Sequence, residues 1–249
     1  MRPSPKRHLP SMVTALNLFA GFLSVIHSIR GDFLTAAWLI VVAAIMDVLD
    51  GKVARLVKSS SEFGVELDSL ADISSFGFAP AILIYQSFLH TDGFVGIVIS
   101  FLPLVFGGIR LARFNIEVTD FHEKDDFFKG LPIPSSAISL AAFVVFEQAT
   151  FGGFYHREVL IALAIIVSLL MVSRVRYDSM PRLSMRRPSD IVKMALLAIF
   201  IPLFVLYPSK IIFPTMMVFL LTGLLRTAVA HFKQHDDEDE EVPDIPVVE

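Results

Sequence analysis

Long apolar runs separated by short polar segments occupy most of the sequence. Each run is close to the roughly 20 residues that a helix needs to cross the hydrocarbon core of a bilayer. The pattern therefore predicts an all-α polytopic membrane protein with about eight transmembrane helices. We expect these helices near residues 11–29, 33–56, 66–89, 93–115, 134–150, 157–173, 190–206 and 210–230.

The composition favours the same class of protein. Hydrophobic residues make up 54% of the 249 residues and charged residues only 18%, which excludes a disordered chain and argues against an ordinary soluble domain. The chain has no cysteine, so disulfides, thiolate metal sites and a cysteine nucleophile are excluded. We expect membrane lipid around the protein and no nucleic-acid partner.

Basic residues gather on one side of the predicted helices. All of the 21 Lys and Arg residues except Arg30, Arg157 and Lys210 fall at the termini or in loops on that side. Cytoplasmic loops carry the excess of Lys and Arg, so the pattern predicts an inner-membrane protein with both termini in the cytoplasm. An even number of helices agrees with this arrangement.

The end of the chain differs from the rest because it is strongly acidic. The run from Asp236 to Glu241 contains only Asp and Glu, and it is the main reason why the net charge is -4. Such a segment cannot bury enough apolar surface to fold by itself. We therefore expect a transmembrane domain over residues 1–232, which also carries the candidate chemistry, and an acidic, disordered cytoplasmic tail over residues 233–249.

Four aspartates lie where the pattern predicts membrane. Fourteen apolar residues separate the start of the second helix at Phe33 from Asp47, which places Asp47 roughly 21 Å into a hydrocarbon core about 30 Å thick. Asp50 follows at i+3 on the same helix face, and Asp68 and Asp72 share a face of the next helix at i, i+4. Because a short turn joins the two helices, the two pairs can converge.

Four converging carboxylates without matching cations repel one another, and a divalent metal is the simplest remedy. Ligation by oxygen alone suits Mg²⁺ or Mn²⁺. The alternative is that these residues form a proton relay or structural ion pairs. The small residues Gly51, Ala54 and Gly64 favour a ligand site, because they let a bulky ligand approach the backbone closely.

The spacing of these residues resembles a known signature. From Asp47 to Asp72 the sequence fits DxxDGxxARx8Gx3Dx3D, the signature of the CDP-alcohol phosphotransferases, at every fixed position, including Arg55. Other segments resemble the integral-membrane phosphatidylserine synthases in particular. These segments are Leu9-Pro10 with Thr14 and Asn17, the run from Arg110 to Asn115, the run from Gly130 to Ser136, and the run from Ser173 to Pro181.

The resemblance implies the CDP-alcohol phosphotransferase fold and a homodimeric membrane enzyme. Such an enzyme transfers a phosphatidyl group from CDP-diacylglycerol to a hydroxyl acceptor, here L-serine, and releases CMP. It implies two metal ions held by Asp47, Asp50, Asp68 and Asp72, with Asp72 also the general base. It implies that CDP-diacylglycerol contacts Gly51, Ala54, Arg55, Gly64, Thr14 and Asn17.

Several of these assignments have alternatives. Thr14 and Asn17 can equally form hydrogen bonds that hold helices together. Arg110 and Arg113 have the forked guanidinium that grips the carboxylate of serine, but they can also be ordinary cytoplasmic anchors. The same chemistry with glycerol 3-phosphate or inositol as acceptor remains open. A cation transporter is a remote alternative, because the second half of the sequence has no matching set of acidic residues.

Overall fold

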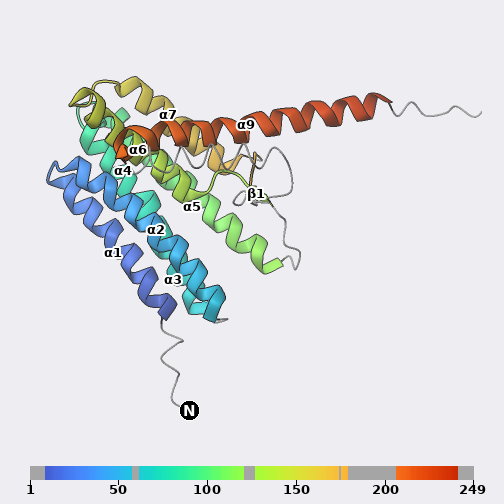
Figure 1. Cartoon of the computed structure of the whole chain (residues 1–249), viewed down its shortest axis with the longest axis horizontal. Helices are drawn as coiled ribbons and strands as arrows, with labels where there is room; N and C mark the ends of the chain where they lie inside the picture. The colour runs from blue at the N-terminus through green and yellow to red at the C-terminus, as the bar shows by residue number, and fades with distance from the viewer. Residues whose placement is uncertain (1–8, 58–61, 121–126, 174, 179–205, 241–249) are drawn as a thin grey trace, which may run out of the picture.

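The computed structural model describes residues 9–57, 62–120, 127–173, 175–178 and 206–240. The described chain is helical apart from one short ribbon of two strands (Figure 1). The elements in order are α1 (Leu9–Ile29), α2 (Phe33–Val57), α3 (Glu62–Asp72), η2 (Ile73–Phe78), α4 (Ala79–Ile84), η3 (Tyr85–Leu89), α5 (Gly93–Asp120), β1 (Phe127–Lys129), α6 (Ile133–Phe151), α7 (Arg157–Val172), β2 (Arg176–Asp178) and α9 (Pro208–Glu240).

Six helical segments of the described chain are long and apolar enough to cross a membrane. They confirm the all-α membrane prediction, but they do not confirm the number eight. α7 has 16 residues and is about 24 Å long, which is shorter than a hydrocarbon core of about 30 Å. The predicted helix at 190–206 lies outside the described residues. The six segments are Met12–Ile29, Phe33–Lys52, Phe63–Leu89, Gly93–Ile116, Ile133–Phe151 and Pro208–Thr227.

The third membrane segment is not the continuous α-helix that its apolar pattern predicts. It begins at Glu62 and contains two π-helical stretches, η2 and η3. Pro80 lies in the first turn of α4, where it cannot donate the backbone hydrogen bond that an uninterrupted helix requires. π-Helical turns are rare and often occur at functional sites. Here η2 starts directly after Asp72.

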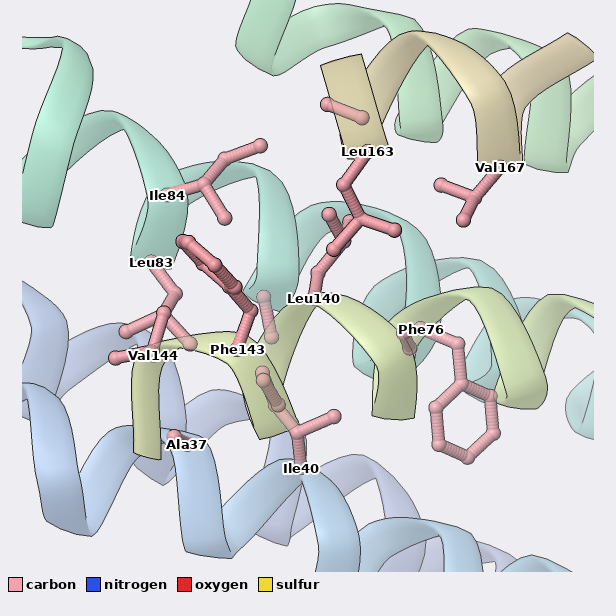
Figure 2. Packing of buried hydrophobic residues seen from close by; sticks show 14 of the residues in the cluster. Ala37, Ile40, Phe76, Leu83, Ile84, Leu140, Phe143, Val144, Leu163 and Val167 are labelled. Atoms are coloured by element: carbon pink, nitrogen blue, oxygen red, sulfur yellow. The ribbon is translucent and has the colours of Figure 1, made fainter. Parts of the chain in front are cut away.

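The packing core lies between α2, α4, α6 and α7. Figure 2 shows Ile40 of α2, Leu83 of α4, Phe143 of α6 and Val167 of α7 among the buried residues of this cluster. α1 and α2 form an antiparallel pair, in which the Ser24 hydroxyl donates to the Ala36 carbonyl at 2.8 Å. Large apolar side chains are exposed on the outward helix faces, as expected for surfaces in contact with lipid.

Polar contacts hold the loops at the end opposite the aspartates. The Glu147 carboxylate is buried and accepts hydrogen bonds from the backbone N–H groups of Tyr155 and His156 at 2.9 and 3.1 Å. Arg157 forms an ion pair with Asp92 at 2.8 Å. These contacts fix the loop between α6 and α7 against the neighbouring helix ends.

The turn between α1 and α2 is fixed in a similar way. Asp32 accepts a hydrogen bond from the backbone N–H of Thr35 at 3.3 Å and lies 3.0 Å from the His27 ring nitrogen. Hydrogen bonding by Thr35, and then by His27, lowers the pKa of the Asp32 carboxyl. Asp32 therefore stays ionised at the start of α2, where a negative charge is favourable.

The sequence pattern does not predict the two-stranded antiparallel ribbon that the structure contains. β1 pairs with β2, with Phe128 opposite Tyr177. The Tyr177 ring is buried against Phe219 of α9, with ring centroids 5.3 Å apart, and it occupies the space that a side chain on Gly223 would need. Burial raises the pKa of Tyr177 to about 12, so the phenol stays protonated at neutral pH.

α9 packs against α6 and β2 and then projects away from the other helices, at the right of Figure 1. It continues to Glu240. The first part of the acidic segment that we expected to be disordered is therefore helical in the structure.

Gly130 joins the ribbon to α6, and its substitution is expected to be costly. It has a positive φ of 81°, and a Cβ there would lie 2.4 Å from the Met171 carbonyl oxygen. Gly152 also has a positive φ, of 72°, but a Cβ there would meet nothing within 4 Å. We expect Gly152→Ala to lose about 1 kcal/mol of stability and Gly130→Ala clearly more. Thermal unfolding in detergent measures the difference, and equal losses would contradict the close approach.

Candidate active site

Three of the four predicted aspartates converge at one point. Asp47 of α2 and Asp68 and Asp72 of α3 each offer a carboxylate oxygen, and these oxygens all lie within 4.8 Å of one another. The three residues are partly buried. They come from two consecutive membrane segments that both pack against α1. The spacing thus predicts the convergence correctly for these three carboxylates.

Asp50 has a different environment from the other three. It is only 6% exposed, and its Oδ2 atom accepts a hydrogen bond from the Thr14 hydroxyl of α1. Its Oδ1 atom is buried and has no hydrogen-bond partner among the described residues. Asp50 is not one of the three residues whose oxygens lie within 4.8 Å. Thr14 therefore contacts Asp50, the one signature aspartate outside this group of three.

The acidic cluster has no direct protein counter-charge in the described part of the chain. No Lys, Arg or His there lies within 4.0 Å of the oxygens of Asp47, Asp50, Asp68 or Asp72. The Oδ1 atom of Asp72 is buried without a hydrogen-bond partner, like that of Asp50. Buried carboxylate oxygens without partners are costly unless something else binds them. An all-oxygen donor set of this kind fits a hard divalent cation such as Mg²⁺ or Mn²⁺.

The two candidate arginines on α5 have different surroundings. Arg110 is partly buried, interacts electrostatically with Asp72, and has a buried Nε atom without a partner in the described residues. Arg113 is exposed and donates to the Val172 carbonyl at the end of α7 at 3.2 Å. The structure thus brings Arg110, rather than Arg113, towards the carboxylates.

Asn17 is buried completely on α1, one turn after Thr14. Neither its side-chain nitrogen nor its side-chain oxygen has a partner among the described residues. Its backbone carbonyl accepts a hydrogen bond from Ser75 of η2 at 3.0 Å. The side-chain amide is therefore available to a polar ligand. If Asn17 only held helices together, its amide would be expected to have a hydrogen-bond partner on a neighbouring helix.

The small residues of the signature lie beside the carboxylates. Gly51 follows Asp50, and a Cβ there would meet no described atom within 4 Å, so the described part of the chain leaves room for a ligand at this point. Gly64 lies on α3, one turn before Asp68. Ala54 and Arg55 belong to the last turns of α2, but their side chains are outside the part of the chain that the structure describes.

Sequence reasoning missed the residues that hold the third membrane segment in place. Asn115 of α5 donates to the Ser69 hydroxyl of α3 at 3.0 Å. Ser69 and Ser75 each stand three residues from Asp72, one on either side. Asn115 belongs to the run that resembles the synthases, but Ser69 lies at a variable position of the signature. No spacing rule connects the two.

Comparisons with known proteins identify the family of the chain. The family model described as CDP-alcohol phosphatidyltransferase matches residues 7–224. The chain therefore belongs to the CDP-alcohol phosphatidyltransferase family, and the resemblance of the signature is confirmed.

Three relatives are similar over most of the chain. A CDP-diacylglycerol--serine O-phosphatidyltransferase of Helicobacter pylori is 32% identical over 230 residues, which cover 90% of this chain and 92% of the relative. The protein of that name in Mycobacterium leprae is 34% identical over 216 residues, covering 85% and 72%. An archaetidylserine synthase of Methanothermobacter thermautotrophicus is 37% identical over 171 residues, covering 68% and 69%.

The contact between Thr14 and Asp50 leads to a test of stability. Thr14→Val keeps the shape of the side chain but removes the hydroxyl that donates to the buried carboxylate. We expect a loss of about 1 to 3 kcal/mol, because the Asp50 oxygen is left without its partner. Thr14→Ser keeps the hydroxyl and should lose much less. Thermal unfolding in detergent compares the variants, and an unchanged midpoint for Thr14→Val would contradict this role of Thr14.

Proposed function

We propose that this protein transfers the phosphatidyl group of CDP-diacylglycerol to the hydroxyl of L-serine, giving phosphatidylserine and CMP. The observation that carries the proposal is the meeting of the Asp47, Asp68 and Asp72 oxygens within 4.8 Å, on the signature of a family that performs this type of transfer. The names of the similar proteins support serine as the acceptor. Among the possible acceptors, serine is therefore preferred to glycerol 3-phosphate and inositol.

The carboxylates are proposed to hold two divalent ions, Mg²⁺ or Mn²⁺. Asp47, Asp68 and Asp72 can share one ion, because their oxygens already converge. Asp50 has a buried Oδ1 atom available for the second ion, while Thr14 fixes its other oxygen. When bound, such ions neutralise the negative charge of the pyrophosphate and of the CMP leaving group.

Asp72 is proposed to accept the proton of the serine hydroxyl. As the serine oxygen forms its bond to the lipid-side phosphorus, the bond from that phosphorus to the CMP oxygen breaks. The proton moves to the Asp72 carboxylate, and CMP leaves with the electron pair. Support comes from the buried Oδ1 atom of Asp72, which no protein donor occupies among the described residues.

CDP-diacylglycerol is proposed to bind along α1 and the end of α2. The open space at Gly51 supports a close approach of the nucleotide there, with Ala54, Arg55 and Gly64 around it. The side-chain amide of Asn17, which has no partner among the described residues, can serve as a polar contact. Thr14 acts in this proposal mainly through Asp50.

Arg110 is the preferred group for the carboxylate of serine. Its Nε atom is buried without a partner in the described chain, and it lies near the proposed base, Asp72. A guanidinium can bind a carboxylate through two parallel hydrogen bonds. Arg113 uses one N–H group for the Val172 carbonyl, which makes it the weaker candidate.

The proposal includes the cellular setting. We infer an inner-membrane protein whose active site and termini face the cytoplasm, because basic residues gather on the side of the acidic cluster. A homodimer, as the resemblance implies, belongs to the same proposal.

An acceptor panel tests the proposed reaction. Purified protein with CDP-diacylglycerol and Mn²⁺ or Mg²⁺ should release CMP when L-serine is added, and a chelator should stop the release. Asp72→Asn should lower the rate about 10² to 10⁴-fold, because the variant loses both the base and a ligand. Asp92→Asn is the matched control: it makes the same chemical change in the opposite loop, where Asp92 pairs with Arg157, and it should keep most of the activity.

Three outcomes would count against parts of this proposal. CMP release only with glycerol 3-phosphate or inositol would show that the acceptor is wrong. Release that is unaffected by the chelator would show that the metal is wrong. An ion flux that depends on the aspartates, without any CMP release, would support the transporter instead.

The absence of native cysteine makes the orientation easy to test. Arg30→Cys and Lys233→Cys each introduce a single thiol, at the turn after α1 and on α9 beyond the membrane segment that ends at Thr227. In right-side-out vesicles a membrane-impermeant maleimide should label Arg30→Cys at once and Lys233→Cys only after permeabilisation. The reverse pattern would contradict the proposed orientation.

A further inference from the structure

Several large apolar side chains of α3, the helix that carries Asp68 and Asp72, do not pack closely against the neighbouring helices. Phe63, Val65 and Leu70 are 71%, 50% and 61% exposed, so these large side chains add little packing within the described chain. α3 lies against α1, and η2 lies against both α1 and α5. The rotation of α3 about its axis must therefore depend on a small number of specific contacts.

One such contact joins η2 to α1. The Ser75 hydroxyl donates to the Asn17 carbonyl at 3.0 Å, and a Cβ on Gly21 would lie 2.4 Å from the Ser75 oxygen. Gly21 thus lets the two backbones approach closely. This contact fixes the segment on the side that follows Asp72.

The contact on the other side of Asp72 is the hydrogen bond from Asn115 Nδ2 to Ser69 Oγ, at 3.0 Å. It joins two consecutive membrane segments, and the two bonded residues are 46 positions apart in the chain. Ser69 immediately follows Asp68, so a rotation of α3 that broke this bond would also move both carboxylates. Ser69 and Ser75 together hold the Asp72 turn between α5 and α1.

The origin of this contact lies in how α5 packs. A Cβ on Gly77 of η2 would lie 2.9 Å from Leu104 of α5, so η2 and α5 are in close contact at a point five residues after Asp72. Asn115 lies 11 residues after Leu104, or about 16 Å further along α5, and reaches α3 on the cytoplasmic side. Ser69 lies eight residues before Gly77, so Asn115 and Ser69 lie towards the same end of this contact, where the long Asn side chain reaches the hydroxyl.

We propose that Asn115 is a positioning residue, which acts through Ser69 to hold Asp68 and Asp72 at the distance from Asp47 that a divalent ion requires. This inference rests on the proposed metal site, and it assigns Asn115 no contact with the substrates. Groups that orient metal ligands commonly change metal affinity or activity 10 to 100-fold when they are removed. The side-chain amide of Asn115 has this role because it donates to the hydroxyl beside Asp68.

The test measures Mn²⁺ binding to the full-length protein in detergent, without substrates, from the electron paramagnetic resonance signal of free Mn²⁺. Asn115→Ala and Ser69→Ala should each weaken Mn²⁺ binding about 10-fold. The double variant should be no weaker than either single variant, because both substitutions remove the same bond. Ser69→Thr keeps the hydroxyl and should restore most of the affinity.

Ser100→Ala is the matched control. It removes a hydroxyl from α5 whose partner among the described residues is in its own helix, the Ile97 carbonyl at 2.9 Å, and the variant should bind Mn²⁺ like the wild type. Circular dichroism shows whether each variant is folded. If Asn115→Ala does not fold, the comparison of Ser69→Ala with Ser69→Thr still tests the inference.

The outcomes separate this inference from the proposed function. Unchanged Mn²⁺ affinity in Asn115→Ala and Ser69→Ala would overturn the positioning role. A higher KM for serine in Asn115→Ala, with normal Mn²⁺ binding and a normal Ser69→Ala, would show that Asn115 contacts the acceptor instead. If the wild type binds Mn²⁺ but releases CMP only with another acceptor, the acceptor is wrong and the positioning role stands. If the wild type binds no Mn²⁺, both fall.

Discussion

The main physical constraint on this structure is that carboxylates inside a membrane are unfavourable unless a cation or hydrogen-bond donors bind them. Asp47, Asp68 and Asp72 present oxygens within 4.8 Å of one another, and no basic side chain of the described chain lies within 4.0 Å of them. Like charges at that separation repel strongly where the dielectric constant is low. A divalent cation attracts all three carboxylates and so offsets their mutual repulsion. The arrangement that is unfavourable without the cation is therefore the one that the proposed reaction requires.

The rest of the fold can be understood as support for this arrangement. α1 packs against both acidic segments, and its Thr14 hydroxyl fixes Asp50. The π-helical turn after Asp72, the close contact at Gly21 and the bond from Asn115 to Ser69 set the direction of the third segment. At the opposite end, the buried Glu147 holds the connecting loop. The end of the helices with the aspartates, which would admit the soluble head group and serine, is thus separate from the end with Glu147, where polar contacts hold the loops.

The sequence was sufficient for the parts of this account that follow from periodicity and spacing. Apolar runs predict membrane helices. The i, i+4 spacing of Asp68 and Asp72, with the short turn that joins their helix to that of Asp47, predicts that these three carboxylates can face one point. The particular environment of Asp50 could not be predicted, because its partner lies 36 positions away on another helix. The same is true of Asn115 and Ser69, and of the pairing of β1 with β2, because such contacts depend on how helices pack. The apolar pattern also does not predict the π-helical stretches η2 and η3 on either side of α4.

The most direct test of the central claim is X-ray diffraction from crystals of the protein grown with Mn²⁺, recorded where manganese scatters anomalously. The account predicts an anomalous peak between α2 and α3, within coordination distance of an oxygen of each of Asp47, Asp68 and Asp72, as expected for a hard divalent ion bound by oxygen. An experimental map in which these three carboxylates point away from one another, with no anomalous peak between them, would contradict it.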